Sequence, residues 1–525
     1  MQKKKIYFLD TTLRDGTQNS GINFSLQDKI RIATALANFG LDFIEAGFPG
    51  SNPKDEEFFR LTHKNNFASK LTAFSATYHK NKTPQTDALI QKVLAAQTKY
   101  VTVFGKTWDF QTSKILGVNQ AKAFDLIYQT IRFFRIKNRQ VIFDAEHFFD
   151  GFKANPKFAL ACLKAAEKAG AFNLTLCDTN GGTLPAEISE IFQKVQKTIK
   201  TPLGIHAHND SATAVANCLN AVQTGANLVQ TTINGIGERI GNADYNSVLC
   251  NLQLKLGYQI VSAQKLKQLT KLSKLVAEIA NLPLPKNQPF TGENAFRHKG
   301  GIHVSAVQKF PNSYEHIKPD LIGQVSSTTI SELAGKTNVV TLAKIFGLKL
   351  KKDSLITKKI LTQVKELENN GFYFETAEAS FILLVLRAQK NYQPPFLIED
   401  HLVVNSKHDN VTAMVKVRVG KDLKHFAASS DGPVDALNLA VRRAVIKFFP
   451  IIQEISLVDY KVRILDSKEG TAAKIRVLIE SQLGQKHWTT VGCSTNIILA
   501  SLQALNDALE FAIWQKKFLF NKNLK

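Results

Sequence analysis

Two histidines that stand two residues apart, His206 and His208 in the stretch GIHAHND, are the first candidates for a chemical site. Side chains at alternate positions of a β-strand project to the same side, so the two imidazoles would converge. An isolated pair of this kind is more often hydrogen-bonded than metal-bound. Asp15 in FLDTTLRDGTQ and Asn242 in GIGERIGN would add a carboxylate and an amide oxygen. Together the four residues predict a mixed nitrogen and oxygen site for a divalent cation such as Mg, Mn, Zn or Co, open to substrate and water.

Other polar residues follow other apolar stretches in the same way. Arg14 stands beside Asp15, Glu45 lies in DFIEAG, Glu146 lies in QVIFDAEH, and Thr179 lies in NLTLCDT. A single polar residue at the end of a strand is unremarkable in a turn. Such residues form a site only where the strands that carry them bring their ends together.

The first half of the sequence alternates short β-branched or apolar runs with amphipathic helical stretches, the pattern of repeated βα units. Eight strands are expected: IYFLD, DFIEAG, KLTAFSA, YVTVFG, QVIFDAEH, NLTLCDT, LGIHAHND and LVQTTING. Eight βα units in about 250 residues predict a TIM barrel, in which functional residues gather at the carboxyl ends of the strands. A doubly wound open sheet is the alternative, but no GxGxxG motif follows the first strand.

The loop after the eighth strand, NGIGERIGNADYNS, contains three glycines, Gly235, Gly237 and Gly241. A lone glycine-rich loop is more often a tight turn than a phosphate cradle. Here we expect the glycines to bring the backbone close enough for Asn242 to reach the metal.

Composition narrows the class of protein. The 5 cysteines are far apart and never form a CxxC pair, which argues against a disulfide framework and a zinc-thiolate site. The net charge of +23 would suit a nucleic-acid partner, but the lysines fall mostly on helical faces without aromatic interleaving, so no nucleic-acid partner is expected. The apolar run in MQKKKIYFLD is too short for a signal peptide, and no uninterrupted apolar stretch approaches about 18 residues. We therefore expect a cytoplasmic protein that does not span a membrane.

The second half differs in pattern. Helical segments such as DSLITKKILTQVKELENNG predict a small helical linker region, and the adjacent prolines of NYQPPF mark a boundary. Beyond it lies a weak repeat: TAMVKVRV precedes VDALNLAVRRAVIKFF, and AAKIRVLIE precedes IILASLQALNDALEFAI. We expect an α+β domain of two units, each a strand meander followed by a helix. The expected domains are a catalytic barrel at residues 1–275, linker subdomains at 276–390 and a C-terminal domain at 391–525.

Three motifs in order, DTTLRDG, HAHND and GIGERIGN, resemble a known family. It comprises barrel metalloenzymes that condense an acetyl thioester with a 2-keto acid: the isopropylmalate, homocitrate and citramalate synthases of the DRE-TIM metallolyase superfamily. FPGSNPKDEEFF, DAEHFFDGFKANP, LCDTNGGTLP and AFRHKGGIHVSAV favour the citramalate synthases. EAGFP is also the isopropylmalate synthase form.

The resemblance assigns roles to the barrel residues. Asp15, His206, His208 and Asn242 would hold the cation, which acts as a Lewis acid on the keto acid. Arg14 would stabilise the carbonyl oxygen as it becomes an alkoxide. Thr179 would hydrogen-bond the keto acid's carboxylate.

The resemblance also bears on proton transfer. Glu146 is the carboxylate expected near the chelated substrate. His303 and Tyr314, from a subdomain of the same or a neighbouring subunit, would assist enolisation or thioester hydrolysis. The general base is either Glu146 or a water linked to His303.

The implied reaction is the condensation of acetyl-CoA with pyruvate to citramalate and CoA, the first step of a threonine-independent route to isoleucine. The implied partners are these two substrates, a second copy of the chain in a homodimer, and isoleucine as feedback inhibitor at the C-terminal regulatory domain. The alternative is a 2-isopropylmalate synthase that uses 2-ketoisovalerate. A lyase of the hydroxymethylglutaryl-CoA type is disfavoured because the loop GIGERIGNA lacks that family's cysteine.

Overall fold

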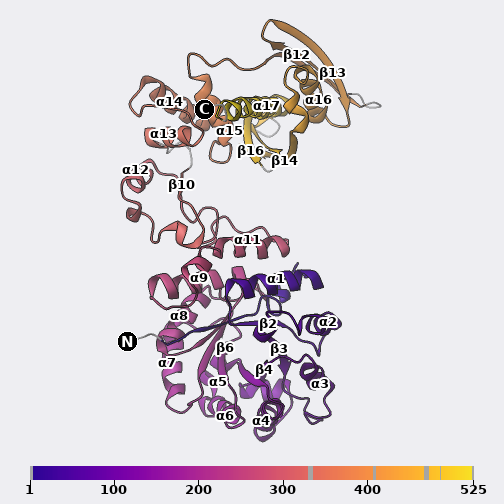
Figure 1. The fold of residues 1–525 in the computed structure, drawn as a ribbon, viewed down its shortest axis with the longest axis vertical. Coiled ribbons are helices and arrows are strands. Elements are labelled where there is room, and N and C mark those ends of the chain that lie inside the picture. The colour runs from indigo at the N-terminus through magenta and orange to yellow at the C-terminus, as the bar shows by residue number, and fades with distance from the viewer. Residues whose placement is uncertain (1–3, 329–334, 406–409, 466–471, 485, 523–525) are drawn as a thin grey trace. The chain divides into compact units, whose positions relative to one another are not determined.

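The computed structural model describes residues 4–328, 335–405, 410–465, 472–484 and 486–522 (Figure 1). Within it the chain forms two compact units. The first comprises Met1–Phe296 and Ile317–Val325, and the second comprises Arg297–His316 and Ser326–Lys525.

The first unit is a closed barrel of eight parallel strands in sequence order. The strands are β1 Tyr7–Asp10, β2 Phe43–Gly47, β3 Leu71–Ala76, β4 Tyr100–Lys106, β5 Gln140–Glu146, β6 Asn173–Asp178, β7 Leu203–Ala207 and β8 Leu228–Thr231. β1 pairs with β8 in parallel, and this pairing closes the sheet. The prediction of a TIM barrel is confirmed, and all eight expected strands form.

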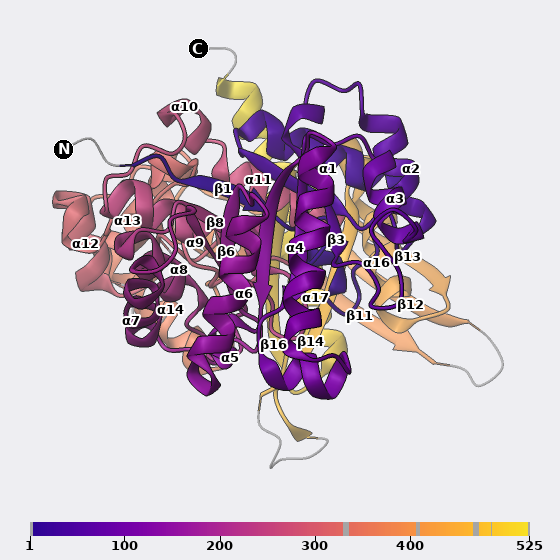
Figure 2. The same cartoon turned by 90° about the horizontal axis from the view of Figure 1, so that it is seen from below.

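Helices surround the barrel (Figure 2). They are α1 Leu26–Phe39, α2 Pro53–Thr62, α3 Ala88–Ala95, α4 Gln120–Ile136, α5 Phe148–Ala154, α6 Pro156–Lys168, α7 Pro185–Gln196, α8 Ala214–Thr224, α9 Tyr245–Cys250, α10 Ala263–Leu266 and α11 Leu269–Ile279. Local sequence sets their ends: Ser25 and Asp28 form a capping box at the start of α1, and Gly40, with φ 119°, closes its end. α4 and α6 pack side by side in both views.

The side chains inside the barrel change from apolar to polar along its axis. At one level it is apolar, with a cluster formed by Leu9, Phe43, Ile142 and Leu228. Since strand side chains alternate, the inward positions two residues further along are the next level. On four strands these positions are polar and buried, and we call them the polar layer: Glu45 on β2, Thr102 on β4, Asp144 on β5 and Gln230 on β8. This layer lies between the apolar level and the carboxyl ends of the strands.

The second unit begins with short elements and helices. They are β9 Arg297–His298, α12 Gly301–Lys309, β10 Ser327–Thr328, α13 Lys336–Ile345, α14 Leu355–Asn369 and α15 Glu378–Arg387. β9 and β10 form a two-stranded parallel sheet.

The rest of the second unit is the expected repeat. One half comprises β11 Leu397–Val404, β12 Val411–Val419, β13 Asp422–Ser430 and α16 Pro433–Val445. The other comprises β14 Ser456–Ile464, β15 Ile475–Leu483, β16 Lys486–Ser494 and α17 Ile497–Lys522. Each half is an antiparallel three-stranded sheet followed by a helix that packs on its own sheet, so the predicted α+β architecture is confirmed.

Among the described residues, α17 is the one helix long and apolar enough to cross a membrane by length and composition alone. Its segment Ile497–Lys516 has a mean hydropathy of 1.3, and 67% of the segment is buried within the structure. The helix packs on β15, β16 and α15. Its apolar surface is therefore largely used for packing, as in the core helix of a folded domain.

Candidate active site

The predicted barrel residues all lie at the carboxyl ends of the strands. Arg14 and Asp15 follow β1, Glu146 ends β5, Thr179 follows β6, His206 lies in β7, His208 comes just after it, and Asn242 lies in the loop after β8. A cavity of about 200 Å³ opens here, lined by Arg14, Asp15, Glu146, Thr179, His206 and His208 together with Gln18, Phe74, Phe104, Asp144, Cys177 and Glu238. Asn242 is buried beside this site.

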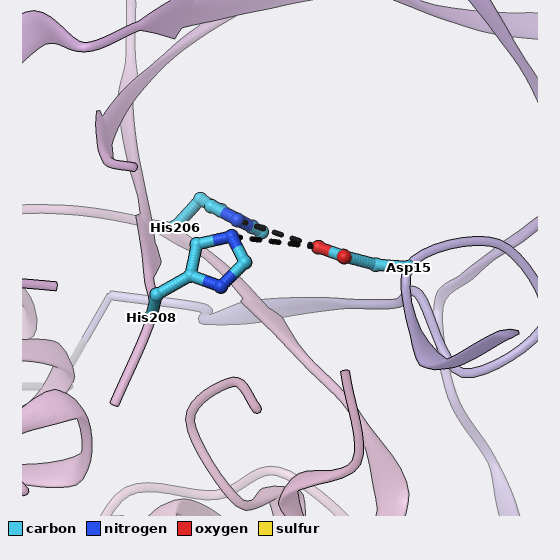
Figure 3. Close-up of side chains that lie close together, drawn as sticks. All are labelled: Asp15, His206 and His208. Carbon is cyan, nitrogen blue, oxygen red and sulfur yellow. Dashed lines mark ion pairs between the residues drawn. The ribbon is translucent and has the colours of Figure 1, made fainter. Parts of the chain in front are cut away.

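Figure 3 shows the two rings of His206 and His208 on one side and the carboxyl group of Asp15 pointing toward them from the other. The Oδ2 atom of Asp15 lies 3.6 Å from Nε2 of His206 and 3.9 Å from Nε2 of His208. Each of the three residues offers one possible ligand atom, and these atoms all lie within 4.8 Å of one another. All three are buried, and the two imidazole planes are inclined by 72°. This spacing suits three ligands of one cation.

The protonation states also suit a cation. Burial, and to a smaller extent the neighbouring His208, lower the pKa of His206 to about 3. Burial likewise lowers the pKa of His208. Burial alone would raise the pKa of Asp15, but Arg14 and the two histidines outweigh this effect and hold it below its usual value. At neutral pH the site therefore holds two neutral imidazoles and one carboxylate, the forms that bind metals.

Several polar atoms of this cluster are buried and have no hydrogen-bond partner among the described residues. They are Oδ1 of Asp15, Nδ1 of His208, and both Oδ1 and Nδ2 of Asn242. A buried polar atom without a partner is costly, and native proteins keep few of them. A divalent cation bound by Asp15, His206, His208 and Asn242 would satisfy the oxygen atoms, so the donor set fits such an ion.

The glycine-rich loop brings Asn242 next to His208, and its role as a metal ligand stays a prediction. Asn242 pairs with His208 in an isolated antiparallel bridge, and its N–H donates to the carbonyl of Gly235 over 3.0 Å. Gly241 has φ 103°, and a Cβ there would meet the Gly235 carbonyl oxygen at 1.9 Å. A Cβ on Gly237 would meet the Asn242 amide at 2.5 Å. Only glycine permits this close approach of the loop to the strand end.

Arg14 is held on two sides. Its Nε donates to Oε1 of Glu45 over 2.5 Å, and its guanidinium lies 4.0 Å from the centre of the Phe74 ring. Burial would lower the pKa of Arg14, but Glu45 and Asp15 keep it above its usual value. Arg14 is therefore a fixed cation at the mouth of the barrel.

Glu146 and Thr179 have partners that sequence reasoning did not identify. Glu146 forms an ion pair with Lys106 over 2.7 Å, between residues that lie side by side on β5 and β4. The hydroxyl oxygen of Thr179 accepts a hydrogen bond from the N–H of His147 over 2.8 Å. This leaves the Thr179 hydroxyl proton available to a ligand in the cavity.

The cavity also contains residues that the sequence analysis missed. Phe74 and Phe104 line it, and their rings stack with centres 5.2 Å apart. Burial raises the pKa of Asp144 well above its usual value, and Glu45 adds to the effect. Alternation along the strands would have placed all three inside the barrel, but inward aromatic residues are usually core residues, so no signal marked them as functional.

His303 and Tyr314 belong to the second unit of the chain. His303 lies in α12, and Tyr314 follows the short turn Pro311–Ser313. Their rings stack with centres 4.2 Å apart and an interplanar angle of 26°. The two residues are thus brought to each other, and their role in catalysis stays a prediction.

Comparison with family models covers nearly the whole chain. Residues 5–276 match the HMGL-like family. Residues 290–371 match a homocitrate synthase post-HMGL domain-like family. Residues 375–513 match the LeuA allosteric (dimerisation) domain.

Individual relatives match over nearly their full length. The (R)-citramalate synthase of Aquifex aeolicus (strain VF5) is 47% identical over 517 residues, which cover 97% of this chain and 98% of the relative. That of Synechocystis sp. (strain ATCC 27184 / PCC 6803 / Kazusa) is 46% identical over 529 residues, covering 98% and 97%. A 2-isopropylmalate synthase of Acetivibrio thermocellus is only 29% identical over 519 residues, covering 97% and 98%. The chain belongs to the HMGL-like family and, within it, to the (R)-citramalate synthases rather than to the 2-isopropylmalate synthases.

Proposed function

We propose that this chain condenses acetyl-CoA with pyruvate to give (R)-citramalate and CoA. The observation that carries the proposal is the buried group of Asp15, His206 and His208, whose possible ligand atoms lie within 4.8 Å of one another, with Asn242 next to His208 and Arg14 next to Asp15. A metal site next to a fixed guanidinium suits a reaction in which a carbonyl oxygen gains negative charge.

The protein's own groups would orient the keto acid. Thr179, whose hydroxyl oxygen is already an acceptor for His147, would donate to the carboxylate of pyruvate. Arg14, fixed by Glu45 and Phe74, would face the keto oxygen. A divalent cation of the Mg, Mn, Zn or Co group, when bound by the four ligands, supplies Lewis acidity at this point.

The chemistry requires a base and a water. A base removes a proton from the acetyl methyl group, and the resulting carbon forms a bond to C2 of pyruvate while the keto oxygen takes the negative charge and then a proton. Water then cleaves the thioester bond, which releases CoA as its thiol and leaves a carboxylate. Glu146, paired with Lys106, is one candidate for the base, and a water held by His303 is the other.

The aromatic wall of the cavity bears on the choice of keto acid. Phe74 and Phe104 stack against each other on one side of the cavity, and Phe48 packs against Phe74 with ring centres 5.7 Å apart. These rings leave about 200 Å³ for substrate. A methyl group fits such a wall better than the branched tail of 2-ketoisovalerate, although a hydrophobic pocket discriminates only about 10–200-fold per methylene group.

The second unit supports assembly and regulation. The meanders expose apolar side chains on their strands: Leu402, Val404 and Met414 in one half, and Val458, Val462 and Ile464 in the other. A second copy of the chain would cover such surfaces in a homodimer. We further propose that residues 391–525 form the regulatory and dimerisation domain, that isoleucine is its feedback inhibitor, and that the enzyme works in the cytoplasm.

The test is the release of free thiol from acetyl-CoA by the purified chain with pyruvate, 2-ketobutyrate, 2-ketoisovalerate or 2-ketoglutarate, with and without a chelator. We expect release that prefers pyruvate and stops with the chelator. A preference for 2-ketoisovalerate would move the substrate to that of the isopropylmalate synthases. No release with any keto acid would overturn the proposal.

A further inference from the structure

Gln230 is a buried amide inside the barrel. It belongs to the polar layer and is only 1% exposed. Its Nε2 atom donates a hydrogen bond to Oδ1 of Asp144 over 2.6 Å, across the barrel from β8 to β5. This bond turns the amide oxygen, Oε1, away from Asp144.

The Oε1 atom of Gln230 is buried and makes no hydrogen bond of normal geometry within the described residues. β7 and β8 are parallel neighbours, with Gly204 opposite Leu228 and Ile205 opposite Val229. In the same register the next positions are His206 and Gln230, so the two side chains lie next to each other on the inner face of the barrel. Nε2 of His206 is the ring nitrogen that lies toward Asp15, at 3.6 Å from its Oδ2. The ring nitrogen left for Gln230 is therefore Nδ1.

We propose that Gln230, oriented by Asp144, is a positioning residue for His206: its Oε1 accepts a hydrogen bond from Nδ1–H and thereby keeps Nε2 unprotonated for a divalent cation. A neutral imidazole carries its proton on either nitrogen, and only one of the two forms presents Nε2 to a metal. An acceptor behind the ring selects that form and fixes the ring plane. The inference rests on the metal site proposed above.

The same arrangement explains why the polar layer lies directly beneath the site. Glu45 of this layer bonds to Arg14, and Gln230, which bonds to Asp144, is next to His206 in the register of β7 and β8. The polar layer thus provides a fixed partner for Arg14 and for the proposed metal ligand His206. An apolar layer of the same volume would fill the barrel but would fix neither group.

The first experiment measures the affinity of the metal-free, full-length protein for Mn²⁺ by titration calorimetry. Gln230→Met keeps the shape of the side chain and removes the acceptor, and we expect binding about 10–100-fold weaker than in the wild type. Thr72→Val is the matched control, because Thr72 is equally buried in the barrel and bonds to Thr102 of the polar layer. The control should bind within about twofold of the wild type. Equal affinity of Gln230→Met and wild type overturns the role of Gln230.

A second measurement is read from the wild type itself, and a variant serves only to assign the signals. Two-dimensional ¹⁵N–¹H NMR of the histidine rings in the metal-free wild type, with His206 assigned by the loss of its signals in His206→Gln, reports which nitrogen carries the proton. We expect the proton on Nδ1, and a proton on Nε2 overturns the inference. A wild type that binds no Mn²⁺ overturns the metal site and this inference with it, whereas tight binding by both wild type and Gln230→Met overturns the inference alone.

Discussion

Each unit of the chain contains a buried cluster of charged residues, and the two clusters differ in how their atoms are satisfied. In the second unit, Arg387 on α15 meets Asp507 and Glu510 on α17, and we call these residues with Ser380 and Tyr392 the Arg387 cluster. Arg387 donates to Oδ1 of Asp507 over 2.7 Å and to Oε2 of Glu510 over 2.6 Å. Ser380 donates to Oδ2 of Asp507 over 2.6 Å, and Tyr392 donates to Oε1 of Glu510 over 2.9 Å. All four carboxylate oxygens have partners.

The barrel cluster of Asp15, His206, His208 and Asn242 has the opposite pattern of hydrogen-bond pairing. Asp15, His208 and Asn242 are as deeply buried, yet within the described part of the chain each has at least one polar atom without a hydrogen-bond partner. Since an unsatisfied buried group costs stability, the fold gains nothing from this arrangement by itself. The Arg387 cluster, in which the carboxylate oxygens are all paired, holds helices together. The barrel cluster, in which some polar atoms are unpaired, is suited to bind a ligand.

The pKa directions alone would not have separated the two clusters. Burial raises the pKa of Asp507 although Arg387 opposes it, and the charges around Asp15 lower its pKa although burial opposes them. Both carboxyl groups are perturbed, but only one belongs to the candidate site. Shifted pKa values mark structural ion pairs as well as functional groups.

The comparison is tested most strongly by removing a ligand from the barrel cluster. In His208→Ala we expect the rate of thiol release to fall by about 10⁴-fold, equivalent to about 5.5 kcal/mol, because one metal ligand and its Lewis acidity are lost. The free energy of unfolding of the metal-free protein should change by no more than about 1 kcal/mol, because the side chain lines an open cavity and one of its nitrogens has no partner. Activity assays and denaturant titration measure the two effects.

His63→Ala, at an exposed histidine outside this cavity, is the control and should change neither quantity. A His208→Ala protein that loses several kcal/mol of stability while it keeps its metal affinity would place the barrel cluster with the structural ion pairs.

The converse change removes the cation of the Arg387 cluster. Arg387→Met leaves two buried carboxylates without their shared partner, and loss of one member of a buried pair costs about 3–5 kcal/mol. Because the Arg387 side chain is 37% exposed, we expect about 2–4 kcal/mol, measured by denaturant titration. Mn²⁺ affinity should not change.

Arg418→Met is the matched control in the same unit, because Arg418 pairs with Glu399 on the exposed surface. Such surface pairs contribute about 0–1 kcal/mol. A loss in Arg387→Met no greater than in Arg418→Met would contradict the structural role of the cluster.

Much of the fold and part of the site could be predicted from the sequence because they depend on local patterns. The alternation of strands and helices gave the barrel, and positions two apart on one strand brought His206 and His208 together. The contacts that support the site join distant residues: Arg14 bonds to Glu45, 31 positions away, and Gln230 bonds to Asp144, 86 positions away. No periodicity specifies such pairs, since they depend on the radius and register of the closed barrel.

The second unit gives the same lesson. The repeat of strands and helices was visible in the sequence, whereas the Arg387 cluster joins residues 120 and 123 positions apart and was not. Polar residues such as Asp507 and Glu510 inside the apolar helix α17 are a signal that buried partners must exist. Their identity follows only from which helices pack together.

The smallest expected effect concerns Asp10, a buried carboxyl group that has hydrogen-bond partners and a shifted pKa. It is buried at the end of β1 outside the metal cluster, accepts hydrogen bonds from the N–H and hydroxyl of Thr12, and its pKa is raised by burial to about 7. Its unfolded value is 3.8. Because the folded state binds the proton more tightly, the unfolded state releases it first, so the contribution to stability falls as pH rises from about 4 to about 7.

Asp10→Asn removes this dependence and keeps a side chain of the same shape. Relative to the wild type, the variant should gain about 2–3 kcal/mol in the free energy of unfolding between pH 5 and pH 8, because only the wild type must ionise a buried carboxyl group. Denaturant titrations of both proteins at several pH values, in the presence of a chelator, give this difference directly. Other buried carboxyl groups with raised pKa values, such as Asp144, titrate in both proteins and cancel in the subtraction. A stability difference between the two proteins that is constant from pH 5 to pH 8 would contradict this prediction. It would mean that Thr12 satisfies the Asp10 carboxyl group as fully as Arg387 and Ser380 satisfy that of Asp507. Burial without a counter-charge would then not be enough to shift the pKa of a carboxyl group in this barrel.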